Sequence, residues 1–370
     1  MSYILFLFSL LPSFSLNLGF GGIPLRYLAL PGLLFPARVN KESIYILVAV
    51  LFHLFWVLFA SPFGRKFHLL DISYILTYLY TFLCVVVCYN NSESVKKYVV
   101  YFFYVNIFYA VIQNIALNAG VPSQYLLLHQ NTHAESYSIP NSIIPIFWRV
   151  TGLFNESVPY VLYLSFSMLF FFSIGHRIKG YLAAIFILTS GAKSALLILT
   201  ALALSRFFSR IKLYMLIPAI FTLLLFLLVF YAPDINDYLL SEPALFSIYL
   251  RVVGILSTVV DFGGNIEVFF FGSGFVSSTD LMTKGLLAVE RGTDYFSLYI
   301  YSNGVFGTLL LNLPFYWYLK QATKRFSCNE INKISIVLFF SLMLSGSYTL
   351  YVYSYFIMLC TLIDRLRNKI

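Results

Sequence analysis

Three arginines stand in segments of this chain where a lone positive charge needs an explanation: Arg149, Arg251 and Arg291. A guanidinium group stays charged at physiological pH and offers paired N–H donors, which suits it to bind a diphosphate. Beside an apolar helix bundle an unpaired arginine is costly, so each is expected either to be neutralised or to bind a ligand. The alternative for each is a salt bridge to a loop acid or a contact with a lipid head group.

Two acidic residues follow these arginines closely. Arg149 opens a segment that ends in Asn155 and Glu156, and Asp294 follows Arg291 by three positions. Glu156 and Asp294 are candidate catalytic acids because either could activate an acceptor hydroxyl, and Asn155 could bind substrate. All three can instead cap the helix that follows them.

Lys193 lies in the polar segment Thr189-Ser-Gly-Ala-Lys-Ser194 within an apolar region. It is either buried near the membrane midplane, and then a candidate substrate-binding residue, or its ammonium reaches the membrane surface.

His129 and His133 have i,i+4 spacing and lie near Glu135. No second ligand cluster accompanies them, so a polar loop is favoured and neither a metal nor a cofactor is predicted. The segment Phe271-Gly-Ser-Gly-Phe275 follows a β-like apolar run at 267–271 and lacks the lysine of a phosphate-binding loop, which favours a tight turn.

The elements that position these residues are predicted from composition. Hydrophobic residues make up 60% of the 370 positions and charged residues 11%. Long apolar runs recur along the chain, so we expect an all-α polytopic membrane protein with about 12 transmembrane helices in one integral membrane domain, residues 1–370. The four cysteines are not spaced as a disulfide framework.

The formal net charge of +9 is best explained by membrane topology. In the predicted topology, sixteen of the Lys and Arg residues and four of the acids lie at cytoplasmic helix ends, whereas six Lys and Arg and eleven acids lie in outer loops. This is the positive-inside bias, and it removes any need for a nucleic-acid partner. Arg65 and Lys66, in a short outer loop, violate the bias.

The single spans are predicted at 3–19, 22–37, 43–61, 69–89, 98–118, 157–175, 212–231 and 295–319.

Two apolar stretches lie between basic clusters, so a single crossing would place one cluster outside. We therefore expect each to be a pair of short helices: 180–205 breaks at 189–194, and 334–364 breaks at 345–348.

Two outer loops are long, 119–156 and 232–294. Within the second, 241–261 has apolar residues at helical spacing, and its other face carries Arg251, Gly254 and Thr258. We expect an amphipathic helix lying on the membrane, with Arg251 turned away from lipid. The alternative is a thirteenth span.

Several of these segments resemble the O-antigen polymerase (Wzy) and O-antigen ligase superfamily. The resemblance covers most of the chain. It rests on the order of the spans, the long outer loop with its Gly-Ser-Gly turn, and four motifs: Arg149-x-x-Gly-Leu-Phe-x-Glu156, Thr189-Ser-Gly-Ala-Lys-Ser194 with Lys193 in place of the usual Arg, Asp294-Tyr-Phe-Ser-Leu, and Asn303-Gly-x-x-Gly307.

The resemblance implies a GT-C-like fold and a metal-independent glycosyltransferase in the bacterial inner membrane, with its active site facing the periplasm. Such an enzyme moves a growing glycan from undecaprenyl diphosphate to an incoming lipid-linked repeat unit, in company with a flippase and a chain-length regulator. Ligases tend to carry a His where Asp294 stands, which favours a polymerase in lipopolysaccharide or other surface polysaccharide biosynthesis.

Three alternatives stay open at this point. An O-antigen ligase shares the chemistry, a flippase for lipid-linked oligosaccharide would carry charged residues within several spans, and a membrane scaffold would leave the arginines without a role.

Overall fold

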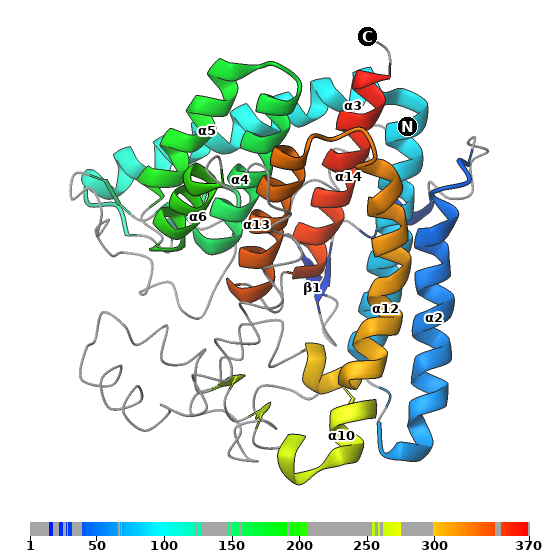
Figure 1. The fold of residues 1–370 in the computed structure, drawn as a ribbon. Helices are drawn as coiled ribbons and strands as arrows, with labels where there is room; N and C mark the ends of the chain where they lie inside the picture. The colour runs from blue at the N-terminus through cyan, green and yellow to red at the C-terminus, as the bar shows by residue number, and fades with distance from the viewer. Residues whose placement is uncertain are drawn as a thin grey trace.

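The computed structural model describes most of the helical part of the chain. The described residues are 15–17, 22–24, 27, 29–31, 39–65, 67, 69–122, 125–126, 147–148, 150–154, 157–190, 193–205, 254–255, 258–259, 262–274, 299–344 and 349–368. Within these ranges the protein is mostly helical, with a single pair of short strands (Figure 1).

The strands correct one prediction. β1 (Ser15–Asn17) pairs antiparallel with β2 (Gly22–Pro24), Ser15 opposite Pro24. Helices at 3–19 and 22–37 therefore cannot extend over these residues. Asn and Gly are weak helix formers, and Pro24 donates no backbone hydrogen bond, so it sits readily at a strand end.

α2 (Ile44–Ala60) continues into the 3-10 turn η2 (Ser61–Phe63). One face of α2 is buried, yet Leu51, Phe55 and Leu58 on the opposite face are 64%, 55% and 75% exposed. A helix that is apolar on all sides is suited to a lipid environment. The segments Ile44–Phe63 and Asp71–Asn118 are both long and apolar enough to cross a membrane.

α3 (Leu69–Asn118) is two helical arms joined at a kink. Asn91 has non-helical φ −139° and ψ 46° within the polar sequence Asn-Asn-Ser-Glu-Ser. Side chains of Asn and Ser compete for backbone hydrogen bonds, which favours a break here. The predicted spans 69–89 and 98–118 lie in the two arms.

Helix breaks occur at both predicted positions. α4 (Ser157–Ser173) is followed by α5 (Arg177–Thr189) and α6 (Lys193–Leu204), with the break between Thr189 and Lys193. α13 (Cys328–Leu344) and α14 (Thr349–Arg367) are separated at 345–348. The core lies between these helices and α3, with aromatic contacts such as Tyr163–Tyr355 at 5.1 Å.

The second outer loop is described in part. Of the expected helix 241–261, residues 254–255 and 258–259 are described and are helical, and Gly254 and Thr258 are buried. The expected β-like run at 267–271 is wrong: it is the helix α10 (Ile266–Phe271), which Asn265 caps by accepting from the Val268 N–H at 3.2 Å. α12 (Tyr301–Ala322) follows.

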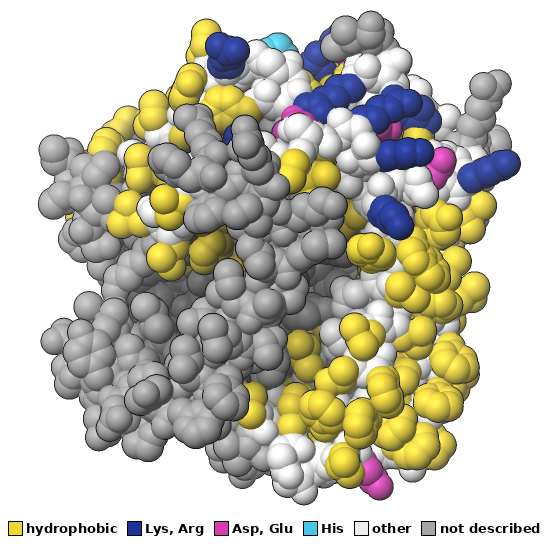
Figure 2. Space-filling view, in the orientation of Figure 1, with side chains coloured by type: hydrophobic (Ala, Val, Ile, Leu, Met, Phe, Trp, Pro, Cys, Tyr) yellow, Lys and Arg dark blue, Asp and Glu magenta, His cyan; other side chains and the backbone are white. Residues whose placement is uncertain are grey.

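Positive charge gathers at one end of the molecule. Apart from Arg65, every described Lys and Arg side chain belongs to the start of α2, the α3 bend, the start of α5, the end of α12, the α12–α13 connection, the first two turns of α13 or the end of α14. Figure 2 shows these side chains at the top, above a broad apolar surface over α2 and α12. The described basic residues thus gather at one end, as the charge sorting predicts; most acids of the predicted outer loops lie outside the described residues, and which side of a membrane the basic end faces stays a prediction. All four cysteines are free thiols.

Candidate functional site

A buried polar cluster lies at the other end of α2. His53 is the one His, Lys, Arg, Asp or Glu residue in this helix, and it shares the buried face with Trp56 and Ala60. After η2 the chain turns back, and Arg65 points into the protein instead of outward. Asp71 stands in the first turn of α3, where the helix dipole favours a negative charge.

Asp71 holds the cluster together. Its Oδ1 accepts a hydrogen bond from Arg65 Nη2 at 2.6 Å and lies 2.9 Å from His53 Nε2. The side chains of all three residues are fully buried. A buried charge requires a partner, and here the guanidinium and the carboxylate neutralise each other.

Asn303 of α12 joins this cluster from a distant part of the sequence. Arg65 Nη2 donates to its Oδ1 at 3.3 Å, and its Nδ2 donates to the Tyr299 carbonyl oxygen at 3.0 Å. The next residue, Gly304, has φ 66° and ψ 178°, so α12 is broken directly beside the ion pair. Broken helices leave backbone groups for ligands or side chains to bind.

The break in α12 contacts the Gly-Ser-Gly turn at 272–274, which lies within the predicted loop 232–294. Gly272 and Gly304 pack backbone to backbone: a Cβ on Gly272 would lie 2.3 Å from Ser302 O, and one on Gly304 would lie 2.4 Å from Phe270 O. Both residues have positive φ, which a side chain disfavours. The N–H groups of Ser273 and Gly274 donate to the carbonyls of residues 301 and 302 at 3.1 and 3.0 Å. The predicted turn at Gly-Ser-Gly is therefore an attachment point for α12.

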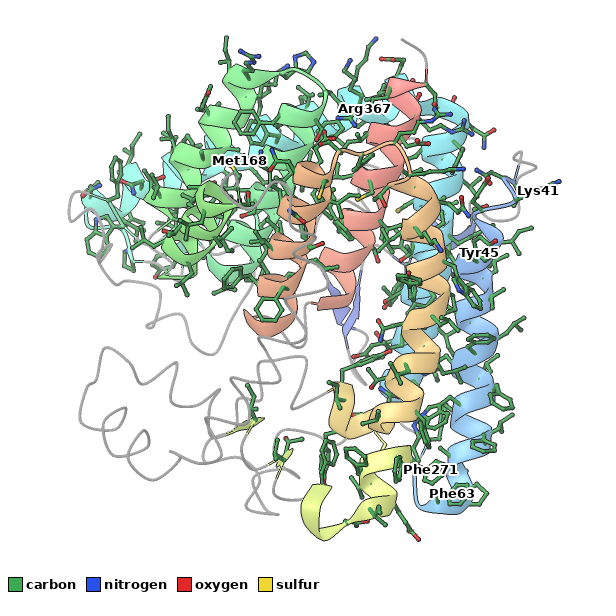
Figure 3. All side chains as sticks on the ribbon, viewed as in Figure 1. Lys41, Tyr45, Phe63, Met168, Phe271 and Arg367 are labelled. Carbon is green, nitrogen blue, oxygen red and sulfur yellow. The ribbon has the colours of Figure 1, made fainter. Side chains whose placement is uncertain are left out.

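Aromatic rings enclose the cluster. His53 stacks on Tyr74 with ring centroids 6.0 Å apart and meets the edge of Tyr78 at 5.8 Å. Farther out, Phe63 of η2 stacks on Phe271 of α10 at 4.0 Å, as Figure 3 shows near the lower end of α2. These contacts keep water away from the ion pair.

Two ring nitrogens on the buried face of α2 lie at the cluster. His53 Nδ1 and Trp56 Nε1 are buried and have no hydrogen-bond partner among the described residues. If His53 donates to Asp71 through Nε2, its Nδ1 is left as a hydrogen-bond acceptor. No group of three His, Cys, Asp or Glu side chains that could hold a metal occurs in the described part of the chain.

A second polar anchor holds the turn that leads into α4. Gln113 Oε1 accepts from the N–H groups of Thr151 and Gly152 at 3.2 and 2.9 Å, and Asn106 Oδ1 accepts from Leu153 at 3.1 Å. Gly152 has φ 57°, a conformation that favours glycine, and the chain turns here. Two buried amides of α3 thus position the middle of the Arg149–Glu156 motif.

The residues Arg149, Asn155, Glu156, Arg251, Arg291 and Asp294 lie outside the described residues, as do His129, His133 and Lys66. Lys193 is described by its backbone alone, as the first residue of α6.

Sequence reasoning missed the buried cluster. Arg65 violates the positive-inside bias of the predicted topology, and the structure gives the reason: Asp71 neutralises it within the protein. This violation of the positive-inside bias was one feature of the sequence that pointed to the buried cluster. His53, an ionisable residue in an otherwise apolar span, was a second signal. Comparison of the chain with models of known families, with curated proteins and with solved structures finds no match.

Proposed function

We propose that this protein is a surface-polysaccharide polymerase that transfers a growing glycan from undecaprenyl diphosphate to an incoming lipid-linked repeat unit. It acts from a helical domain of about 12 spans in the bacterial inner membrane, with the site on the periplasmic face. The observation that carries the proposal is the joining of three motif segments to the bundle: Gly272–Gly274 on the broken helix α12, Asn303 on Arg65, and Gly152 on Gln113.

These attachments matter because such a transfer depends on positioning. The lipid diphosphate is already a good leaving group, so the enzyme must hold it, stabilise its developing charge and place the acceptor hydroxyl in line. Arg291 and Arg251 are assigned to the diphosphate, and Arg149 to the diphosphate or the glycan. No metal is needed for this.

The acceptor side requires a base and a glycan-binding surface. Asp294 or Glu156 is assigned to take the proton of the acceptor hydroxyl, and Asn155 and Lys193 to bind substrate. Asp294 lies nine positions before Asn303. The contact between α12 and Gly272–Gly274 therefore fixes the C-terminal end of the segment that contains Asp294.

Replacement of Arg291 tests the proposal. Removing one contact to the transition-state charge costs about 3 kcal/mol, or on the order of a hundredfold in rate. In a deletion strain complemented with R291A, we expect single-repeat glycolipid without long-chain polysaccharide. K284A, which removes another cation from the same loop, is the matched control and should restore long chains. Normal chain length with R291A would refute the assignment.

A flippase for lipid-linked oligosaccharide is the second candidate, and one observation favours it. The cluster of His53, Asp71 and Arg65 is a set of ionisable side chains buried between helices, as proton-coupled transporters use. Loss of a flippase leaves no repeat unit on the outer face, whereas loss of a polymerase leaves one repeat. Glycan banding in the deletion strain therefore separates the two. A ligase would instead leave polymer on undecaprenyl diphosphate.

A further inference from the structure

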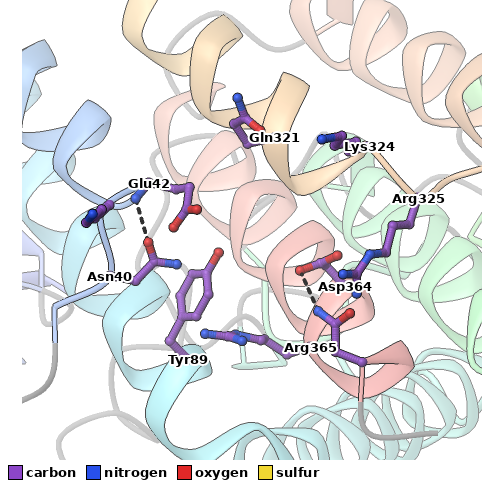
Figure 4. Close-up of a pocket in the computed structure, with 10 residues that line it drawn as sticks. Asn40, Glu42, Tyr89, Gln321, Lys324, Arg325, Asp364 and Arg365 are labelled. Carbon is purple, nitrogen blue, oxygen red and sulfur yellow. Dashed lines mark hydrogen bonds between the residues drawn. The ribbon is translucent and has the colours of Figure 1, made fainter.

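A cavity of about 490 Å³ opens at the basic end of the molecule, far along α2 from the buried cluster. It lies where the start of α2, the first arm of α3 and the ends of α12 and α14 meet (Figure 4). Its walls come from four distant parts of the sequence, so the cavity exists only in the folded bundle.

The lining is charged and has a positive excess. It holds four basic side chains, Lys41, Lys324, Arg325 and Arg365, and two acidic ones, Glu42 and Asp364. None of the four cations forms an ion pair within 4.0 Å with any residue that the structure describes. The surplus of two positive charges therefore favours an anion in the cavity.

Arg365 is already ordered for such a ligand. Its guanidinium carbon lies 3.7 Å from the ring centroid of Tyr89, and Figure 4 shows the two side chains crossing at the cavity wall. Its Nε is buried and has no hydrogen-bond partner among the described residues. Stacking fixes the plane of the guanidinium before an anion arrives, which lowers the entropy lost on binding.

The two carboxylates narrow the class of ligand. They would repel a bare anion from their side of the cavity, but they can accept hydrogen bonds from hydroxyl groups. Asp364 also accepts from Asn368 Nδ2 at 3.2 Å, which holds it in place. A ligand that has a phosphate at one end and hydroxyls at the other satisfies both kinds of side chain.

The position of the cavity suggests where such a ligand comes from. It lies among the basic side chains at the top of Figure 2, directly above the exposed apolar surface of α2 and α12. Head groups of anionic lipids occupy that level when helices cross a bilayer, and basic pockets between helix ends recognise them.

We infer that this cavity binds a hydroxyl-bearing phosphate ester, such as the head group of phosphatidylglycerol, with Arg325 and Arg365 on the phosphate and Asp364 on the hydroxyls. The inference does not depend on the proposed glycan transfer, because it concerns the opposite end of the helices and a different ligand.

The test uses the full chain purified in detergent. Phosphatidylglycerol and phosphatidylcholine are titrated separately and the retained lipid is measured by native mass spectrometry; inorganic phosphate is titrated separately by thermal shift. We expect phosphatidylglycerol to bind more tightly than phosphatidylcholine, and R325Q/R365Q to weaken its binding at least about tenfold, since charged hydrogen bonds are lost. K41Q/K324Q, which changes exposed side chains only, should weaken it in the same direction without affecting folding.

The control is K320Q/R177Q, which removes two exposed cations at the same end but outside the cavity. It should bind phosphatidylglycerol like the wild type. Stabilisation by inorganic phosphate that R325Q/R365Q abolishes would also support the phosphate site, and together with equal binding of the two lipids it would point to a soluble ester as the source. Equal binding by all variants, or equal binding of both lipids without any effect of phosphate, would overturn the inference.

Discussion

Replacing Asp71 by alanine should destabilise the protein far more than removing any surface carboxylate. The substitution leaves Arg65 charged and His53 without its partner in a site where all three side chains are fully buried. Breaking a buried pair by removing one partner costs about 3–5 kcal/mol, on the order of a thousandfold in the unfolding equilibrium constant.

The mechanism predicts a specific rescue. If the cost comes from the uncompensated guanidinium, then R65M/D71L should recover at least half of the lost stability, because apolar replacements of a buried pair are often neutral. Recovery should be incomplete, since Asn303 Oδ1 loses its donor, at about 1 kcal/mol.

Equilibrium unfolding of the purified protein in mixed micelles with increasing SDS measures these differences. E93A is the matched control, because Glu93 is 55% exposed and its nitrogen–oxygen distance to Lys96 is 3.9 Å. Such a surface pair contributes at most about 1 kcal/mol. The reasoning fails if D71A stays within about 1 kcal/mol of the wild type, or if R65M/D71L is as unstable as D71A.

Three further predictions concern other contacts. G304A should destabilise the protein by about 1–3 kcal/mol or more through strain at positive φ and overlap with the Phe270 carbonyl, whereas G264A, which faces open space, should have little effect in the same assay. Q113L should loosen the turn before α4 by leaving two buried N–H groups unpaired, at about 1–3 kcal/mol for each, and limited proteolysis should detect cleavage there. Burial opposes ionisation of Glu330, but its ion pair with Arg367 and its hydrogen bonds from Ser327 together outweigh this and lower the pKa of the carboxyl. Because the folded pKa is below the unfolded value, the stabilisation is present above the ordinary pKa of a Glu side chain, 4.5, and disappears as the pH falls through the folded pKa. E330Q should therefore reduce the loss of stability at acid pH.

Much of the helical framework follows from local sequence. The breaks between α5 and α6 and between α13 and α14 were predicted because two basic clusters could not lie at opposite ends of one span. The kink at Asn91 follows from a run of residues with polar side chains that compete for backbone groups. Basic clusters and helix-breaking residues act over a few positions, so the helix ends that they cause can be predicted from the sequence.

The failures have a different physical origin. The run at 267–271 has β-forming composition, yet it is helical because Asn265 caps it and its aromatic rings pack on η2 and α12. Tertiary contacts overrode a weak local preference. The hairpin of β1 and β2 was missed because hydrophobicity alone does not distinguish a short strand from the end of a span.

The candidate site was the least predictable part. Arg65 and Asp71 are six positions apart, but Asn303 joins them across 238 positions, and no local pattern records that approach. Glycines give a partial signal: Gly272 and Gly304 were both noticed in motifs, but their contact with each other depends on the path of the whole chain.

The contact between Gly272 and Gly304 determines which sequence changes this part of the chain can tolerate. It joins the residues on either side of the segment 275–298 through main-chain atoms alone. Substitutions, insertions or deletions inside that segment therefore leave this contact intact. Changes in the length or sequence of this stretch could therefore accumulate without loss of the contact that joins α10 to α12.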